Sequence, residues 1–255
     1  MAPANKRRQF IARALGGAAA LMTAGCDRLS HSEWFVNMLG TGERLSSTAQ
    51  HLVTSAKSMA QEFTEADLSP QFRSNGTSKP NSPRYQTMAE HDFIEYRLQV
   101  TGLVEQPVEL TLAELRGLPS RTQITRHDCV EGWSAIGKWQ GVQLSRVLDR
   151  VRPRPEARYV VFHCADPMEA GGPNYYESID MEDAYHPQTI LAYQLNDKPL
   201  PVANGAPIRV RIERQLGYKM AKFIMHIELV SSFDRIGGGK GGYWEDQGYQ
   251  WYAGI

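Results

Sequence analysis

Cys129 is the residue of this sequence whose type and neighbours most directly suggest chemistry. It lies in the segment HDCVEGWS, residues 127–134, and it is one of three cysteines among 255 residues. Arg126 and His127 precede it, and positively charged neighbours lower the pKa of a thiol. A thiolate is both a nucleophile and a soft metal ligand, and this setting favours the ligand. A buried and inert cysteine is the alternative that the chemistry alone leaves open.

Two later segments carry residue types that suit an anionic ligand. In NGAPIR, residues 204–209, the Asn-Gly pair predicts a turn, and Arg209 can hold a phosphate through two parallel hydrogen bonds. In GYKMAK, residues 217–222, backbone amide groups and Lys222 can face the same anion. Taken alone, each segment also fits an ordinary turn with a surface side chain. Their matched spacing favours one shared binding site.

Together with Trp139, Gly141 and Leu144, these three segments resemble the core signature of the sulfite-oxidase-type molybdopterin oxidoreductases. That family includes the catalytic subunits of bacterial periplasmic methionine-sulfoxide reductases. The resemblance covers residues 90 to 230, and three ordered segments with similar intervals are much more specific than one. It implies an α+β fold of the sulfite-oxidase type, with mixed sheets and short helices. It also implies a molybdenum–molybdopterin cofactor whose metal is bound directly by the Cys129 thiolate.

Further residues are expected to surround this cofactor. Arg126 and Glu131, on either side of Cys129, are expected to tune the metal or to contact the substrate. The residues expected to contact the pterin are Asn75, Cys164, Asn204, Arg209, Met220, Ala221 and Lys222.

Some of these assignments have simpler alternatives. Cys164 stands where the family has a small polar residue, and a buried apolar cysteine explains it at least as well. Asn75 precedes Gly76, and this pair also fits a plain turn. A disulfide between Cys129 and Cys164 would exclude the metal, but the resemblance places Cys129 on molybdenum. The segment YYES, residues 175–178, either faces the metal or places an aromatic pair in the core.

The expected reaction is a two-electron oxygen-atom transfer, because molybdenum changes its oxidation state by two electrons. The substrate is then a sulfoxide or a sulfur oxyanion, either a small molecule or part of a protein. Sulfite oxidation favours a strongly cationic pocket, and sulfoxide reduction favours an open groove with aromatic walls. The aromatic content favours sulfoxide reduction slightly, but Arg121, Arg126 and Lys138 near Cys129 leave both reactions open. An exported, non-catalytic binding protein that retains the fold is the alternative from another class.

Electrons are expected to pass through a separate protein. The sequence contains no Cys-x-x-Cys-His motif and too few cysteines for a Cys-ligated iron–sulfur cluster. The redox partner is therefore expected to carry a haem. The formal net charge is zero, which implies no nucleic-acid partner and no binding to an anionic membrane surface. Membrane contact is expected only through the redox partner or a lipid anchor.

The N-terminus predicts export to the periplasm. KRRQFI, residues 6–11, is a twin-arginine sequence followed by apolar positions, and residues 12–23 are small and only mildly apolar. This stretch is too short to span a membrane, and it is typical of a twin-arginine export signal. TAGC, residues 23–26, resembles a lipoprotein cleavage site, although Thr23 departs from the usual leucine. Lipidation of Cys26 and ordinary cleavage nearby are both open, and a basic, disordered N-terminus is the alternative to a signal.

Composition divides the chain into four parts. Apolar residues recur at helical spacing over 27–68, whereas proline and Asn-Gly break regular structure over 69–90. The aromatic-rich tail is expected to pack back on the domain or to line the entrance of the site. The expected parts are a signal segment 1–26, a helical extension and loop 27–90, a molybdopterin-binding domain 91–235 and a Gly/aromatic tail 236–255.

Local signals predict several elements of the central domain. Alternating or compact apolar patterns predict strands over residues 93–100, 158–164 and 208–213. The last of these alternates strictly, as a half-buried strand does. Helices are predicted after a capping box that begins at Thr111, over 144–151 ahead of Pro153, and over 181–184 with Asp180 as the cap.

Overall fold

The structure, a computed structural model, describes Ser32, Trp34 and residues 58–255. The description below concerns the compact unit Ser55–Ile255. The predicted export signal and nearly all of the predicted helical stretch before residue 58 lie outside the described residues. Among the residues that the structure describes, no helix is long and apolar enough to cross a membrane.

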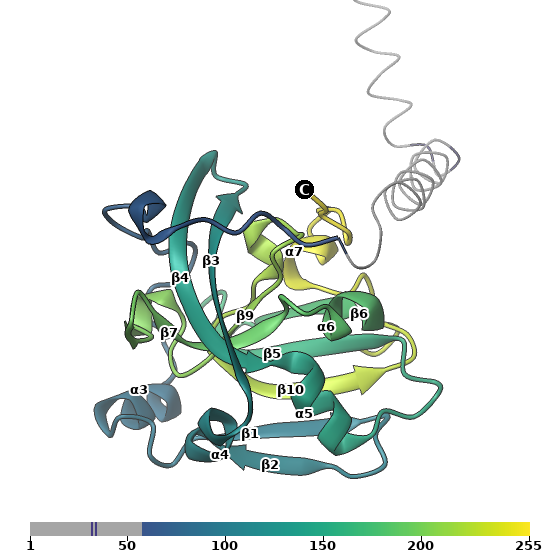
Figure 1. The fold of residues 1–255 in the computed structure, drawn as a ribbon. Coiled ribbons are helices and arrows are strands. Elements are labelled where there is room, and N and C mark those ends of the chain that lie inside the picture. The colour runs from purple at the N-terminus through teal and green to yellow at the C-terminus, as the bar shows by residue number, and fades with distance from the viewer. Residues whose placement is uncertain (1–31, 33, 35–57) are drawn as a thin grey trace, which may run out of the picture. The chain divides into compact units, whose positions relative to one another are not determined.

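One of the two sheets has the strand order β2-β1-β10-β5-β6 (Figure 1). Strands β1 and β10 run parallel and the other neighbours antiparallel, so the sheet is mixed. Its strands are β1 (Arg97–Gly102), β2 (Val108–Thr111), β5 (Tyr159–Pro167), β6 (Asn174–Asp180) and β10 (Ile224–Val230).

The other sheet has the order β3-β4-β7-β8, with β9 also paired to β7. All of its pairs are antiparallel. Its strands are β3 (Ser120–Cys129), β4 (Trp133–Gln143), β7 (Ile190–Leu195), β8 (Lys198–Pro199) and β9 (Arg209–Arg211). Gly141 lets β4 approach β7, since a Cβ there would lie 2.2 Å from the carbonyl oxygen of Leu191.

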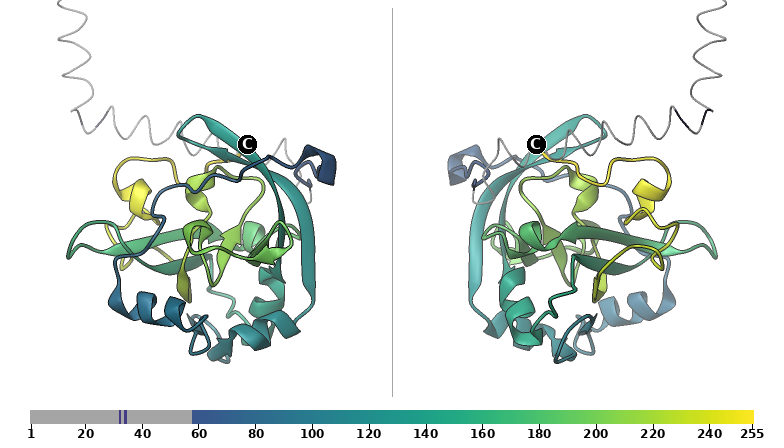
Figure 2. Two further views of the ribbon diagram at one scale, coloured as in Figure 1. Left: turned by 90° about the vertical axis from the view of Figure 1, so that its left-hand side faces the viewer. Right: turned by 90° about the vertical axis from the view of Figure 1, so that its right-hand side faces the viewer.

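Strands β3 and β4 form a long curved ribbon that extends past the neighbouring strands at its tip (Figures 1 and 2). The register runs from Ser120 opposite Val142 to Cys129 opposite Trp133, and the turn contains Gly132 at φ +83°. Side chains alternate between the two faces of a strand. Cys129 therefore sits at the end of β3 on the buried face.

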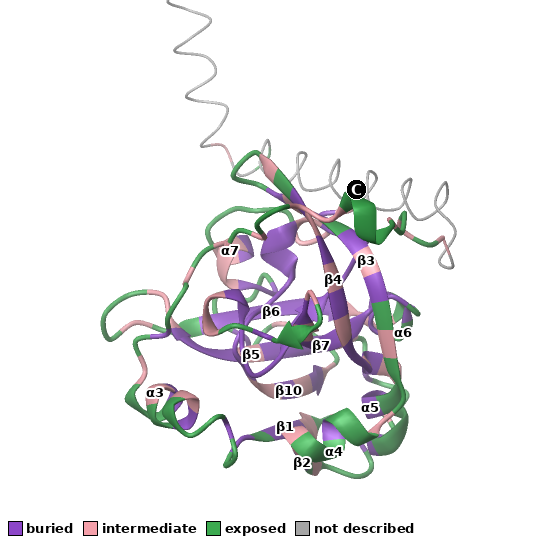
Figure 3. Ribbon diagram, turned by 60° about the vertical axis from the view of Figure 1, so that its left-hand side comes forward, coloured by how far each residue is buried: buried purple, intermediate pink, exposed green. Residues whose placement is uncertain are grey.

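The main hydrophobic core contains side chains from both sheets and from α5 (Leu144–Val151). Leu98, Phe162 and Ile227 come from the first sheet, and Val142 and Leu191 from the second. Figure 3 shows β5 and β6 as mostly buried strands, whereas β10 mixes buried and half-buried residues. This mixture of two sheets and short helices confirms the predicted α+β fold.

The helices are short, and most begin at identifiable caps. At Thr111 the side chain accepts from Glu114 N at 3.0 Å, while Glu114 accepts from Thr111 N at 2.8 Å. Asp180 accepts from Asp183 N at 2.8 Å. These observations confirm the two predicted caps, and the helix predicted over 144–151 is confirmed as α5. The other α-helices are α3 (Pro83–Glu90), α4 (Leu112–Gly117), α6 (Met181–Tyr185) and α7 (Tyr243–Asp246), and the 3-10 helices are η1 (Glu65–Asp67), η2 (Val202–Asn204) and η3 (Gly217–Lys219).

The prediction of helix up to residue 68 is wrong for the described part of that stretch. Glu62 instead forms a bridge with Thr125, and Phe63 N donates to the carbonyl oxygen of Ile124 at 2.8 Å. The segment thus pairs with the edge of β3, and only η1 follows. The loop predicted over 69–90 ends in helix α3, because Pro83 occupies its first turn and Ser82 caps it.

Two predicted strands also differ from the observed ones. The strand predicted from residue 93 begins only at Arg97, since Phe93 has a φ of +57°. The strand predicted over 208–213 is reduced to β9, and it is buried on both faces rather than on one. Its alternating arginines are covered by protein, which a pattern of alternating charge does not reveal. Both of them belong to the surroundings of the candidate site.

Candidate functional site

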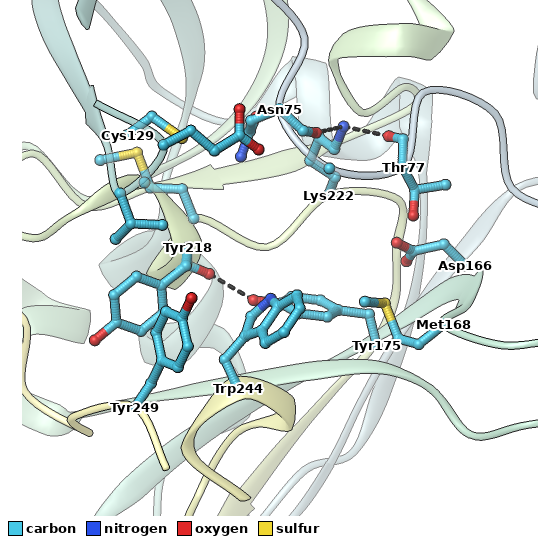
Figure 4. Close-up of a pocket in the computed structure, with 15 residues that line it drawn as sticks. Asn75, Thr77, Cys129, Asp166, Met168, Tyr175, Tyr218, Lys222, Trp244 and Tyr249 are labelled. Atoms are coloured by element: carbon cyan, nitrogen blue, oxygen red, sulfur yellow. Dashed lines mark hydrogen bonds between the residues drawn. The ribbon is translucent and has the colours of Figure 1, made fainter. Parts of the chain in front are cut away.

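A cavity of about 210 Å³, partly open to solvent, lies at the end of β3. Figure 4 shows Cys129, Asn75 and Lys222 along one side of it, with Tyr218, Trp244 and Tyr249 along the other. The remaining wall comes from β5, the segment after it and β6. Segments far apart in the sequence therefore meet around Cys129.

Cys129 is the reactive side chain of this cavity. Its exposed fraction is 9%, and its thiol is free, as is that of Cys164. The alternative of a disulfide between these two cysteines is therefore not what the structure shows. Burial raises the pKa of the Cys129 thiol, and a hydrogen bond from the Glu131 backbone offsets only part of this rise. This corrects the expectation of a lowered pKa, and a bound cation is what would favour the thiolate here.

Arg126 does not reach the cavity. Gln123, Thr125, His127 and Cys129 point to the buried face of β3, so Arg126 lies on the opposite face. Its side chain is 55% exposed and pairs with Asp128 at 2.9 Å. The expectation that Arg126 tunes the metal or contacts the substrate is thus not supported, because the pleat of β3 turns it away.

The other two cations that were expected near Cys129 are also engaged elsewhere. Arg121 pairs with Glu62. Lys138 contacts Glu65 at 2.6 Å and Asp197 at 3.0 Å. Neither Arg121 nor Lys138 lines the cavity around Cys129.

Glu131 lines the cavity next to Cys129, as the sequence predicts. It accepts a hydrogen bond from Trp133 Nε1 at 2.9 Å, and the guanidinium of Arg73 lies 5.1 Å from the centroid of the Trp133 ring. The turn between β3 and β4 therefore fixes this carboxylate at the rim of the cavity. It can orient a ligand or the metal's surroundings from there.

Arg209 is fully buried behind the cavity. Its guanidinium donates to the carbonyl oxygens of Asn204 at 3.2 Å and Met220 at 3.1 Å, and it lies 5.2 Å from the Trp139 ring centroid. Among the described residues, no carboxylate forms an ion pair with it, and its Nε has no partner. Burial, followed by the neighbouring Arg211, lowers the pKa of Arg209 to about 9. A buried cation without a counter-charge is costly, so this position suits a bound anion.

The neighbouring Arg211 shows the contrast. It is equally buried, but it forms a salt bridge with Glu213 at 2.7 Å. It also lies 4.5 Å from the ring centroid of Trp139, so both arginines contact this ring. Arg211 is therefore satisfied by the protein, whereas Arg209 keeps capacity for a ligand.

Lys222 joins the loop before α3 to the site. Its Nζ donates to the carbonyl oxygens of Asn75 at 2.6 Å and Ala203 at 3.1 Å, and also to that of Thr77. Burial lowers its pKa to about 7, with Arg209 contributing in the same direction. Asn75 and Lys222 both line the cavity, as predicted. The lysine thus holds the Asn75 loop in place at the cavity wall.

Two glycines allow this close packing. Gly205 has a φ of +112°, and a Cβ there would lie 3.0 Å from the side chain of Lys222 and 3.1 Å from that of Arg209. At Gly217, a Cβ would lie 2.4 Å from the ring of His127. Side chains at either position would push apart the polar groups around the cavity.

The structure separates the remaining predicted residues. Met220 lines the cavity. Asn204 is buried next to Arg209, and its Nδ2 has no partner. Cys164 and Ala221 belong to the hydrophobic core and do not line the cavity, which for Cys164 fits the buried apolar alternative.

Several wall residues escaped the sequence analysis. Asp166 and Met168 lie at and just beyond the end of β5, and Tyr218 lies in η3. Asp166 is 4% exposed, one of its oxygens has no partner, and burial raises its pKa to about 6. A carboxylate directly after a compact apolar strand was the signal that could have found it. Tyr175 lines the cavity and also belongs to the main hydrophobic core, so segment 175–178 meets both of the alternatives that the sequence left open.

The C-terminal tail does both things that were expected as alternatives. Trp244 and Tyr249 line the cavity. The Tyr249 ring lies 5.3 Å from that of Tyr218 and 5.4 Å from that of Trp244. The same tail packs back on the domain, with Trp251 Nε1 donating to Ser178 Oγ at 2.8 Å.

Residues 85–235 match the family described as the oxidoreductase molybdopterin binding domain. This range contains the Cys129 strand, Arg209 and Lys222. The chain belongs to this family. The family assignment that the three sequence segments suggested is therefore confirmed, and with it the assignment as a molybdopterin-dependent oxidoreductase.

Relatives of this molybdopterin oxidoreductase include named methionine-sulfoxide reductase proteins. A protein of Azospira oryzae, named provisionally as protein-methionine-sulfoxide reductase subunit YedZ1, is 36% identical over 97% of this chain and 87% of its own length. The catalytic subunit MsrP of Xanthomonas axonopodis is 40% identical over 53% of this chain and 45% of its own. MsrP of Ralstonia nicotianae is 35% identical over 66% and 53%. The chain thus spans about half the length of these two catalytic subunits.

Among solved structures, the sulfane dehydrogenase SoxCD of Paracoccus pantotrophus is similar with a TM-score of 0.49. The two chains are 22% identical, and the similarity covers 54% of this chain and 39% of that one.

The residues of this family member fit a molybdopterin. Buried polar atoms without protein partners surround the cavity or lie directly behind it: Asn75 Oδ1, Asp166 Oδ1, Asn204 Nδ2 and Arg209 Nε. A pterin with a phosphate offers donors, acceptors and an anion to such atoms. The Gly205 backbone passes between the side chains of Arg209 and Lys222, and this leaves no protein side chain between the two cations.

Proposed function

We propose that this chain is an exported molybdenum–molybdopterin oxidoreductase that reduces sulfoxides by two-electron oxygen-atom transfer. The observation that carries the choice of substrate is the wall of the cavity around Cys129. Its aromatic side chains are those of Tyr175, Tyr218, Trp244 and Tyr249. Lys222 is the lysine that lines it. A neutral sulfoxide with apolar substituents matches this wall better than a sulfite dianion does.

The position of the cations supports the same choice. Lys222 has its Nζ bound to backbone carbonyl oxygens and sits in a site whose burial lowers its pKa. The wall also carries two acidic side chains, Glu131 and Asp166. These carboxylates would repel an oxyanion substrate, but they would not repel a neutral one. Sulfite oxidation is therefore the second candidate.

In this proposal the cofactor is held by residues that the structure brings together. Cys129 is the metal ligand, Arg209 and Lys222 bind the anionic part, and Asn75, Asn204 and Met220 contact the pterin through their side chains or backbone. When bound, the cofactor supplies the two-electron change and the acceptor for an oxygen atom. Cys164 and Ala221 support this site from the core rather than through the cavity wall.

The chain's own residues contribute binding and a proton store. The aromatic walls exclude water and bind apolar substituents of the substrate. Glu131 orients groups at the rim through its contact with Trp133. Reduction of a sulfoxide to a sulfide and water consumes two electrons and two protons. Asp166, whose pKa is raised to about 6, can hold one of these protons on its unpartnered oxygen.

A separate redox partner, which we propose to be haem-bearing, delivers the electrons. The name of the Azospira oryzae relative describes a subunit, which supports an assembly with another protein. Cys129 and Cys164 are the cysteines of the described residues, and both are free. The physiological substrate is a free or a protein-bound sulfoxide.

The decisive experiment is metal analysis of the purified full chain together with two assays. Expressed in a host that makes the cofactor, the protein should contain about one molybdenum per chain, and it should reduce methyl sulfoxides with a reduced viologen as donor. The reverse test offers sulfite with an oxidised dye. Faster turnover of sulfite would overturn the proposed reaction, and a molybdenum-free protein would support the non-catalytic alternative.

We further propose that the protein is exported to the periplasm through the twin-arginine route, with or without a lipid on Cys26. The double substitution Arg7→Lys and Arg8→Lys keeps both charges but removes the guanidinium groups. The precursor should then accumulate in the cytoplasm with its cofactor bound. Fractionation of cells, with protein and molybdenum measured in each compartment, checks this. Export at the normal rate would contradict the proposed route.

A further inference from the structure

The aromatic wall of the cavity does not all come from the part of the chain that matches the family. That match ends at residue 235, whereas Trp244 and Tyr249 belong to the tail that follows it. Cys129, Arg209 and Lys222 all lie within the match. The metal-binding and the anion-binding groups thus come from the family domain, and part of the substrate wall comes from the segment that follows it.

A buried cluster of charges fastens this segment to the domain. Lys219 of η3 contacts Glu177 of β6 at 2.5 Å and Glu245 of α7 at 2.6 Å. All three side chains are 1% exposed or less. Burial raises the pKa of Glu177, and the nearby Glu245 raises it further. One lysine therefore holds two carboxyl groups, one of them from the tail.

Glu245 is the immediate neighbour of Trp244 in α7, so this cluster fixes the position of the indole at the cavity. Lys219 is likewise the neighbour of Tyr218, whose ring lines the same wall of the cavity as Trp244. The ion cluster therefore ties together the two backbone segments that present the aromatic side chains. Breaking it would separate Trp244 from Tyr218 without touching Cys129.

Further contacts fasten the tail to the domain beyond Trp244. Asp246 accepts a hydrogen bond from the hydroxyl of Tyr176 in β6. Beyond Tyr249, the hydroxyl of Tyr218 donates to the carbonyl oxygen of Gln250 at 2.6 Å. These contacts hold the tail against the cavity, so Trp244 and Tyr249 are built parts of the wall.

We propose that the tail Gly237–Ile255 is the specificity element of this site: Trp244 and Tyr249, with Tyr218, bind the apolar substituent of the substrate, and Glu245 is the positioning residue that holds them there. This inference rests on the proposed sulfoxide reduction. It names the substrate class as sulfoxides in which one substituent on sulfur is an apolar group larger than methyl. Two methyl groups alone would leave the aromatic wall unused.

Substitution of Trp244 tests the wall. Trp244→Ala should raise the KM for methyl phenyl sulfoxide about tenfold and that for dimethyl sulfoxide much less, with a smaller change in kcat. Molybdenum content should equal that of the unsubstituted chain. Tyr185→Ala is the control, because Tyr185 is an exposed aromatic residue of α6 that lies outside both the tail and the cavity wall. Equal rises in KM for both sulfoxides, or the same effect in the control, would overturn the proposal.

Two substitutions at Glu245 test the positioning role. Glu245→Ala removes the tail's contact with Lys219 but leaves the pair of Lys219 with Glu177. It should raise the KM for methyl phenyl sulfoxide about as much as Trp244→Ala does, and chymotrypsin should cleave the tail faster. Glu245→Gln keeps an oxygen that accepts from Lys219, and should bring KM and cleavage back to within about twofold of the unsubstituted values. An unchanged KM in Glu245→Ala would contradict the positioning role.

A ligand that is not reduced separates this inference from the proposed reaction. Binding of methyl phenyl sulfone to the unsubstituted chain and to Trp244→Ala can be measured by calorimetry. Binding about tenfold weaker in the variant supports the aromatic wall, even if the chain reduces no sulfoxide. If sulfoxides are reduced but the sulfone binds both proteins equally, the specificity element is wrong and the proposed reaction stands.

Discussion

Cys129→Ser should leave a folded protein that no longer turns over sulfoxides. Serine is nearly the same size, and Cys129 lies at the end of β3 beside the cavity, so little packing changes. Oxygen is a harder ligand than thiolate, and the redox poise of a metal bound through it differs. The loss of activity should exceed the about 10–100-fold that follows from losing a residue behind the ligands. Turnover with a reduced viologen measures it.

Cys164→Ser is the matched control for that variant. Cys164 is also a free, buried cysteine, but it belongs to the core and does not line the cavity. A hydroxyl there costs about 1–3 kcal/mol of stability where it finds no partner, and turnover per molybdenum should remain. Near-normal activity in Cys129→Ser, or equal losses in both variants, would remove Cys129 from the role of metal ligand.

The second large effect is expected at Arg209. Arg209→Ala removes the buried guanidinium that has no carboxylate partner among the described residues, and a bound phosphate would lose its contact. Truncation of one partner in a buried charged pair costs about 2–5 kcal/mol, so cofactor occupancy should fall strongly. Molybdenum per chain, together with the fluorescence of the released and oxidised pterin, reports the loss without an activity assay.

The control for Arg209 is an arginine outside the cavity. Arg126→Ala removes a largely exposed side chain that pairs with Asp128, and exposed pairs contribute about 0–1 kcal/mol. Its cofactor occupancy should match that of the unsubstituted chain. A thermal melt of Arg209→Ala shows whether the fold is kept. Full molybdenum occupancy at normal yield in Arg209→Ala would show that Arg209 only packs within its strand and does not bind the cofactor.

Local signals predicted those elements whose stability depends on neighbouring residues. The capping box at Thr111 is a reciprocal pair of hydrogen bonds, and the cap at Asp180 is a single one. Both lie within four residues, so the local sequence contains all of their partners. The prediction of a helix before residue 68 was wrong for the opposite reason. Its residues pair with the edge of β3, more than 50 positions away, and that contact overrides helical spacing.

The site divides in the same way. Cys129, Glu131, Asn75, Met220 and Lys222 could be named from the sequence because their segments are distinctive, and the structure places all five at the cavity. The side of β3 on which a residue lies was decided by register. Cys129 faces the cavity and Arg126, three positions earlier, faces away, because successive side chains of a strand point to opposite faces.

The sequence by itself determined the family, the α+β class and the cysteine at the candidate site, since these follow from residue types at short, ordered intervals. Only the tertiary structure decided which cations the cavity keeps and which aromatic side chains form its wall. Arg209 and Arg211 alternate identically along β9, yet only Arg211 has Glu213 as its counter-charge. Lys219 likewise joins β6 to the tail across the fold. Burial and charge pairing are properties of the surrounding protein, so they appear only once the distant segments have packed together.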